Sequence, residues 1–147
     1  MALLVKQEIT ASRERVWDII TDIENSANTI SAITDLTVLE RPESGLLGFK
    51  WTETRTMFGR DASETMWITA VEDGKWYEAS AASHGAEYLS RLEIQDAGDA
   101  VELSMSFQAT PISLLARIMS ISSVLFYGSM KKAFLQDLQD IKRVAES

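Results

Sequence analysis

The fold is decided by the stretch that reads AEYLSRLEIQDAGDAVELSMSFQA at residues 86–109. Apolar and polar residues alternate on both sides of Ala97-Gly98, which is typical of two antiparallel strands joined by a tight turn. We therefore predict strands at 86–96 and 99–109. Both strands have an apolar face, and another part of the chain has to cover it.

The same pattern continues upstream of residue 86. Three further turn signals are Gly59-Arg60, Asp73-Gly74 and His84-Gly85, and the strands between them are 48–58, 61–72 and 75–83. If every turn holds two residues, alternation gives all five strands one shared apolar face and one shared polar face. Trp67 and Trp76 are the exceptions, because this register places them on the polar face.

The N-terminal third predicts two more strands and two short helices. Residues 3–9 alternate and form a first strand, and 33–40 form the second. Thr10 or Ser12 can cap a helix between them, and 25–29 form a second short helix or turn. The apolar stripe of the first helix consists of Val16, Trp17, Ile19, Ile20 and Ile23.

A long C-terminal helix can cover the apolar face of the sheet. Pro111 suits the first position of a helix capped by Thr110, which we expect to run to about Ala145. Its apolar stripe is Tyr127, Met130, Phe134, Leu138, Ile141 and Ala145, and its polar side carries Lys131, Lys132, Asp137, Asp140 and Lys142. This order of elements predicts an α+β helix-grip fold over residues 1–147 as one domain: a curved seven-stranded antiparallel sheet around the helix, with two short helices after the first strand.

Composition limits the classes of function. The net charge of −8 disfavours a nucleic-acid partner, which would require clustered Lys and Arg. The chain has no cysteine, so disulfides and thiolate chemistry are excluded. Charged residues come too early for a signal peptide, and we expect a cytoplasmic location.

The N-terminal residues carry a family resemblance. They are Val5, Glu8 and Ile9, the run Ala11-Ser12-Arg13-Glu14-Arg15-Val16-Trp17, and then Ile20, Asp22 and Ile23. In these residues and in element order over the whole chain, the sequence resembles the START-like (SRPBCC, helix-grip) superfamily, in its polyketide cyclase/dehydrase-like branch. The resemblance implies a deep cavity between sheet and helix that binds lipids, polyketides or isoprenoids in some members, and catalysis in others. It transfers no catalytic residue, and no cofactor is expected.

The candidate ligand site lies on the apolar face of the sheet. Small residues interrupt this face and leave volume, while a few polar residues gather at one end of it, which is typical of ligand pockets. In the predicted register Arg55 lies opposite Glu64, and Glu53 is two residues from Arg55 on the same face. The candidate ligand-binding residues are Trp51, Glu53, Arg55, Glu64, Met66, Tyr77, Ala79, Ala81, Tyr88, Ser90, Met105 and Phe107. The alternative is that the helix fills this volume and that Arg55 and Glu64 form an ordinary cross-strand pair.

We expect structural explanations for two other features, His84 and the apolar segment 111–130. His84 is the only histidine and precedes Gly85, so we expect it in an exposed turn rather than as a general base, and we expect no metal site. Residues 111–130 are unusually apolar, but Arg117 and several serines argue against a membrane span. We expect this segment to be part of the covering helix; the alternative is a mobile lid that makes transient contact with a membrane.

Three classes of function remain open. The first, which we favour, is a carrier or sensor of a small hydrophobic molecule. The second is an enzyme of the polyketide cyclase or dehydratase kind that uses Glu53, Glu64 or Tyr88 as acid or base. The third is a protein-interaction domain. The sequence leaves the ligand and the oligomeric state open.

Overall fold

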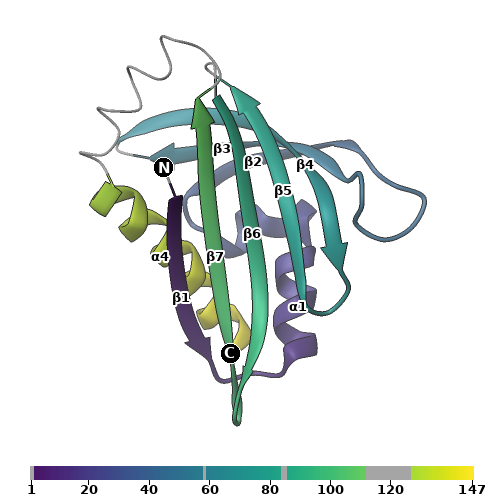
Figure 1. Cartoon of the computed structure of the whole chain (residues 1–147), viewed down its shortest axis with the longest axis vertical. Coiled ribbons are helices and arrows are strands. Elements are labelled where there is room, and N and C mark those ends of the chain that lie inside the picture. Colours follow the sequence, from purple (N-terminus) through teal and green to yellow (C-terminus); the bar gives the residue numbers. More distant parts are fainter. Residues whose placement is uncertain (1, 58, 84–85, 112–126) are drawn as a thin grey trace.

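A seven-stranded antiparallel sheet forms the body of the computed structural model, which describes residues 2–57, 59–83, 86–111 and 127–147 (Figure 1). Its strands are β1 (Ala2–Ile9), β2 (Ile33–Glu40), β3 (Lys50–Met57), β4 (Arg60–Glu72), β5 (Trp76–Ser83), β6 (Ala86–Ala97) and β7 (Ala100–Pro111). The helices are α1 (Arg13–Thr21), η1 (Ile23–Asn25), α2 (Ser26–Thr29) and α4 (Tyr127–Ala145). The predicted helix-grip α+β fold, with short helices after β1 and a long C-terminal helix, is confirmed.

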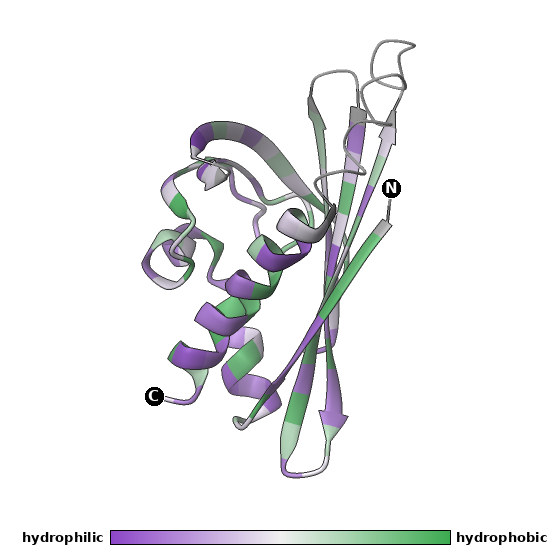
Figure 2. Cartoon of the chain, turned by 90° about the vertical axis from the view of Figure 1, so that its left-hand side faces the viewer, coloured by the Kyte–Doolittle hydropathy of each residue, from purple (hydrophilic) through white to green (hydrophobic). Residues whose placement is uncertain are grey.

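The strands follow one another as a meander, except at one edge. The order in the sheet is β1-β7-β6-β5-β4-β3-β2, so the first strand pairs with the last. Figure 2 shows the helices on one side of the sheet, with the strands curving around them. One face of the sheet is therefore covered, which accounts for its alternation of apolar and polar residues.

The predicted faces of the strands are correct except at the end of β4, but two of the predicted turns are wrong by one residue. Ala97 pairs with Ala100, so the turn residues are Gly98 and Asp99. Likewise, Arg60 pairs with Met57 as the first residue of β4. A glycine with positive φ fits either central position of such a turn, so its presence does not fix the turn position. Moving a turn by one residue changes each partner by two and keeps every side chain on its face.

The central row of the sheet has the predicted register. Ala79 lies opposite Ile68 on one side and opposite Ser90 on the other. At the ends of this row the partners differ from the prediction. Two-residue turns predicted Ile68 opposite Trp51 and Met105 opposite Ser90, whereas Trp51 pairs with Met66 and Ser90 pairs with Phe107.

The β4–β5 loop is also longer than predicted, and a bulge between Ile68 and Ala70 takes up the extra residue. Beyond this bulge the predicted faces are wrong: Ala70, expected on the inner face, lies opposite Glu78, and Val71 lies opposite Tyr77 and packs against the core.

Trp76 on the polar face is explained by a cation–π contact. Its ring lies under the Arg91 guanidinium, 3.9 Å from the guanidinium carbon to the ring centroid, and its Nε1 donates to Glu72. Trp67 pairs with Lys50 and Ser80, both from the predicted polar face. The two tryptophans therefore belong to the outer face, as the register required.

The helices bury most of the stripes that the sequence predicted: Ile19 and Met130 are half-buried, and the side chain of Tyr127 lies outside the described part of the structure. Ser12 is the N-cap of α1, where its Oγ accepts a hydrogen bond from the Arg15 N–H at 3.1 Å. Both stripes join one apolar core with β1 and β7, and its helical members are Val16, Trp17, Ile20, Ile23, Phe134, Leu138, Ile141 and Ala145. This core fixes the long helix against the β1 side of the sheet.

Two expectations about the C-terminal helix are wrong. Pro111 is the last residue of β7, opposite Ala86, and Thr110 pairs with Glu87, so no helix begins at Pro111. Proline is tolerated at a strand end, and Thr-Pro is therefore compatible with both structures. Asp137 and Asp140, expected on the polar side, are buried at 3% and 4% exposure. Asp140 accepts hydrogen bonds from the Ser31 N–H and hydroxyl at 2.9 and 2.8 Å, and so holds the segment before β2 against α4.

Candidate ligand cavity

A cavity of about 300 Å³ lies between the inner face of the sheet and α4. All the candidate residues line it: Trp51, Glu53, Arg55, Glu64, Met66, Tyr77, Ala79, Ala81, Tyr88, Ser90, Met105 and Phe107. Strand alternation was sufficient to place them on one concave face. Whether they contact a ligand stays a prediction.

The volume exists because the middle of the sheet carries small side chains. Ala79 and Ala81 on β5 are buried, and Ser90 lies opposite Ala79 on β6. Neither alanine reaches far towards α4, so space remains between the layers. A larger side chain at either position would point into this space.

An aromatic wall closes one side of the cavity. The rings of Tyr88 and Phe107 stack with centroids 5.6 Å apart, and Phe107 meets Phe134 of α4 at 5.2 Å. Such pairs are held both by buried area and by ring electrostatics. Phe134 therefore connects the helix to the wall that the sheet provides.

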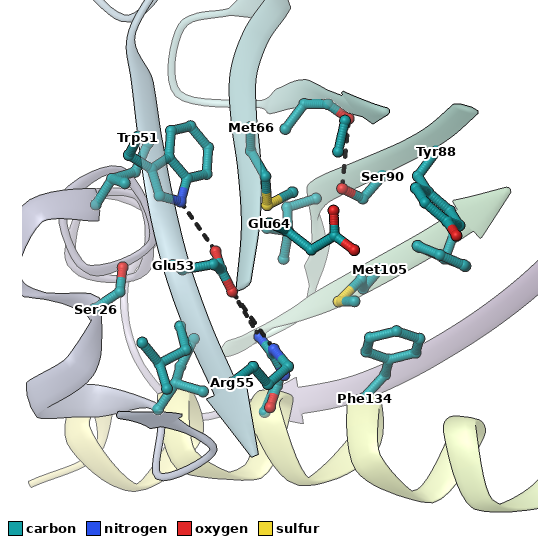
Figure 3. Close-up of a pocket in the computed structure, with 18 of the residues that line it drawn as sticks. Ser26, Trp51, Glu53, Arg55, Glu64, Met66, Tyr88, Ser90, Met105 and Phe134 are labelled. Atoms are coloured by element: carbon teal, nitrogen blue, oxygen red, sulfur yellow. Dashed lines mark hydrogen bonds and ion pairs between the residues drawn. The ribbon is translucent and has the colours of Figure 1, made fainter. Parts of the chain in front are cut away.

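A chain of polar contacts closes the other end (Figure 3). The Trp51 indole N–H donates to Glu53 Oε1 at 2.9 Å. Arg55 donates to Glu53 Oε2 from Nε and Nη2, both at 3.4 Å, and to Asp137 Oδ2 from Nη1 at 2.7 Å. The Arg55 guanidinium thus connects two carboxylates, one on β3 and one on α4.

The predicted pairing of Arg55 with Glu64 is wrong. Because the β3–β4 turn lies one residue earlier, Ala62 is opposite Arg55, and Glu64 is opposite Glu53. The ionic partner that the sequence analysis missed is Asp137. Its signal was present, because Asp137 lies three residues after Phe134 and four before Ile141, at the spacing of the buried stripe.

Asp137 and Arg55 differ in how burial and neighbouring charges shift their pKa values. Burial raises the pKa of Asp137 to about 6; the nearby Arg55 charge opposes this shift, and the negative charges of Glu53 and Asp140 add to it. Burial lowers the pKa of Arg55, but attraction to Asp137 and Glu53 outweighs it, and the net shift is upward. Arg55 is therefore always charged, whereas Asp137 changes protonation close to neutral pH.

The chain matches one protein family over nearly its whole length. The model of the family described as polyketide cyclase / dehydrase and lipid transport matches residues 3–146. The chain belongs to this family. The resemblance inferred from the sequence is confirmed. No curated protein matches the chain at a significant level.

Solved structures of other proteins have the same fold as this member of the polyketide cyclase/dehydrase and lipid transport family. A START superfamily protein from Mycobacterium smegmatis superposes with a TM-score of 0.81 at 13% identity, covering 99% of this chain and 97% of that one. The di-domain ARO/CYC BexL from the BE-7585A biosynthetic pathway gives 0.81 at 11% identity, covering 100% of this chain and 50% of that one. The major latex-like protein 151 from Panax ginseng gives 0.76 at 11% identity, covering 100% and 98%.

Tyr77 lines the cavity and also connects two elements of the fold. Its hydroxyl donates to the Ile20 carbonyl at 3.2 Å, and its ring meets Trp17 edge-on. Burial raises the pKa of the Tyr77 phenol, and the Glu53 charge raises it further. The phenol therefore stays neutral and connects β5 to the end of α1.

Some of the sequence predictions concern residues outside the described ranges. His84 and residues 112–126, which make up most of the apolar segment 111–130, lie outside the described residues. Within the described ranges, no helix is long and apolar enough to cross a membrane. In the described part of the chain, three or more side chains of metal-ligand type are nowhere arranged so that they could hold one metal ion.

Proposed function

We propose that this protein binds one small, largely apolar molecule in the cavity and acts as its carrier or sensor. The observation that carries this proposal is the cavity of about 300 Å³ between sheet and helix. Small-molecule sites occupy about 300–1,000 Å³, are mostly apolar and contain few polar groups. The small side chains of β5, the aromatic wall and the cluster around Arg55 fit this description.

The relatives support the same class of function. The family description names lipid transport beside cyclase and dehydrase activity, and the structural neighbours include a START superfamily protein and an ARO/CYC protein. A lipid, polyketide or isoprenoid-like ligand is consistent with these names. The cytoplasmic location, the membrane contact through 111–130 and the single ligand-binding domain over 1–147 stay predictions.

An enzyme is the second candidate, and Asp137 is the observation that favours it. A carboxyl group with a pKa of about 6 can donate or accept a proton near neutral pH, and Asp137 lines the cavity. Glu64 lines it as well. If the protein turns over a ligand, Asp137→Asn or Glu64→Gln should abolish turnover while binding persists. A carrier would show binding and no chemical change in the recovered ligand.

The experiment that tests the proposal is a titration with an apolar fluorescent probe. We expect about one site per chain and displacement by a lipid-like or polyketide-like compound. Ala79→Phe should fill the cavity and weaken binding, although overpacking also destabilises the fold by about 1–3 kcal/mol. Ala82 is exposed on the same strand, so Ala82→Phe is the matched control. Equal probe affinity in the wild type and both variants would mean that the probe does not bind in this cavity.

A further inference from the structure

The polar end of the cavity carries more negative than positive side chains. Among the described residues that line it, Glu53, Glu64 and Asp137 are acidic, and Arg55 alone is basic. Glu53 and Glu64 lie directly opposite each other on β3 and β4. Glu53 and Asp137 share Arg55 as their one cationic partner within the described residues.

The donors of Arg55 are already directed at two of these carboxylates. Its Nη1 bonds Asp137, and its Nε and Nη2 bond Glu53. A ligand carboxylate would have to compete with both and would bring another negative charge beside Glu53 and Asp137. Arg55 was a candidate ligand-binding residue, and this geometry argues against its binding the carboxylate or carbonyl of a ligand.

A buried acceptor remains available next to this pair. Asp137 is 3% exposed, and its Oδ1 is buried and receives no hydrogen bond from any residue within the described ranges. A buried acceptor without a donor is costly and calls for an explanation. Asp137 lines the cavity, so a donor carried by a ligand could satisfy Oδ1. The raised pKa of Asp137 agrees, because the ionised group lacks full compensation.

We propose that the cavity selects an apolar molecule whose polar head donates hydrogen bonds to Asp137, and that it prefers an amine head to a hydroxyl and a hydroxyl to a carboxylate. An ammonium group supplies both the donor for Oδ1 and a second positive charge for the two carboxylates that share Arg55. A hydroxyl supplies only the donor. A metal ion fits less well, because these carboxylates do not form a ligand cluster. This inference rests on the proposed function.

Three rigid ligands of one shape can test it: 2-naphthylmethylamine, 2-naphthalenemethanol and 2-naphthoate. Calorimetric titration at pH 7.5 should give an affinity for the amine about tenfold higher than for the alcohol, because a charge-assisted hydrogen bond contributes more than a neutral one. The carboxylate should bind most weakly. Displacement of the apolar fluorescent probe verifies that each ligand occupies the cavity.

Two variants connect the preference to the cavity carboxylates. Asp137→Asn should remove most of the amine preference and leave the alcohol affinity within about twofold. Glu64→Gln removes a negative charge from the cavity lining and should also reduce the preference for the amine. This variant provides the test if Asp137→Asn does not fold. Glu87 is exposed at the edge of the polar face, so Glu87→Gln changes the net charge equally outside the cavity and should leave the preference unchanged.

The outcomes separate this inference from the proposed function. Equal affinities for the three ligands, or tightest binding of the carboxylate, would overturn the inference while probe binding keeps the proposed function intact. An amine preference that survives in both cavity variants, or that falls equally in Glu87→Gln, would also overturn it. If neither the probe nor any of the three ligands binds, both the inference and the proposed function fail.

Discussion

Arg55 on β3 donates to Asp137 on α4 across 2.7 Å, and both side chains are largely withdrawn from water. The two residues are 82 positions apart in the sequence, so this contact exists only in the folded chain. It connects the sheet to the long helix at the polar end of the cavity. A buried ion pair of this kind need not stabilise the fold in total, but losing one partner leaves a charge without compensation.

Arg55→Met should therefore destabilise the protein by about 3 kcal/mol, because it leaves Glu53 and Asp137 without their cation. Urea unfolding at neutral pH measures the loss. Arg41 forms an ion pair with Glu24 in which both side chains are more than half exposed, so Arg41→Met is the matched control and should change the stability by about 0–1 kcal/mol. Similar losses in both variants would mean that burial adds nothing to the Arg55 contact.

Stability should fall as the pH rises through the titration of Asp137. Its pKa of about 6 in the folded protein lies above the ordinary value of 3.8, so the native state binds more protons than the unfolded state between these values. The stabilisation from this group is complete below about pH 4 and is lost by about pH 6–7, a loss of roughly 3 kcal/mol. The pKa of Asp140 is lowered, because hydrogen bonds from Ser31 and Gln136 outweigh its burial, and its contribution is instead lost in acid.

Comparison with Asp137→Asn isolates this effect from the other carboxylates. Urea unfolding of both proteins at several pH values from 4 to 7 should show the wild type losing stability relative to the variant as the pH rises. Parallel stability curves over this range would contradict the assigned shift.

Amine binding should weaken in acid for the same reason. Asp137 faces Arg55 and Glu53 from β3 and Asp140 from its own helix, and Glu64 of β4 lines the same cavity. Protonation of Asp137 below about pH 6 removes the charge that favours an ammonium group. The affinity for 2-naphthylmethylamine should therefore fall between pH 7 and pH 5, and the affinity for the alcohol should change less. Calorimetric titration at both pH values checks this, and equal changes for the two ligands would contradict it.

Tyr77→Phe should destabilise the protein by about 1 kcal/mol, because it leaves the Ile20 carbonyl without its donor. Since the phenol connects β5 to the end of α1, the affinity of the apolar probe should stay within about twofold of the wild type. Urea unfolding and probe titration on the same sample measure both quantities. Unchanged stability with lost binding would instead make Tyr77 a ligand contact.

The sequence predicted the faces of the sheet because strand alternation has a period of two. Gly59 and Gly98 marked their turns to within one residue, and an error of that size changes the partners without changing the faces. This is why every candidate cavity residue lines the cavity although Arg55 and Glu64 are not opposite each other. Alternation identifies the face, while the pairing depends on turn geometry that glycine leaves open.

Asp137 shows what alternation and composition could not reveal. Its helical spacing placed it within the buried stripe, but an aspartate in a surface helix is ordinarily solvated. Only the position of Arg55 across the cavity explains its burial, and that contact joins distant parts of the chain. The fold was therefore accessible from local patterns, whereas the polar end of the cavity required the tertiary structure.

The occupied cavity can be observed directly through its methionine methyl groups. Met66, Met105 and Met130 line the cavity, out of six methionines in the chain. With methyl-labelled methionine, each signal can be assigned by a single Met→Leu variant and followed by NMR during titration with the apolar probe. We predict that the Met66, Met105 and Met130 signals shift together and saturate at about one probe per chain. Unchanged signals from all three at saturating probe would contradict binding in this cavity.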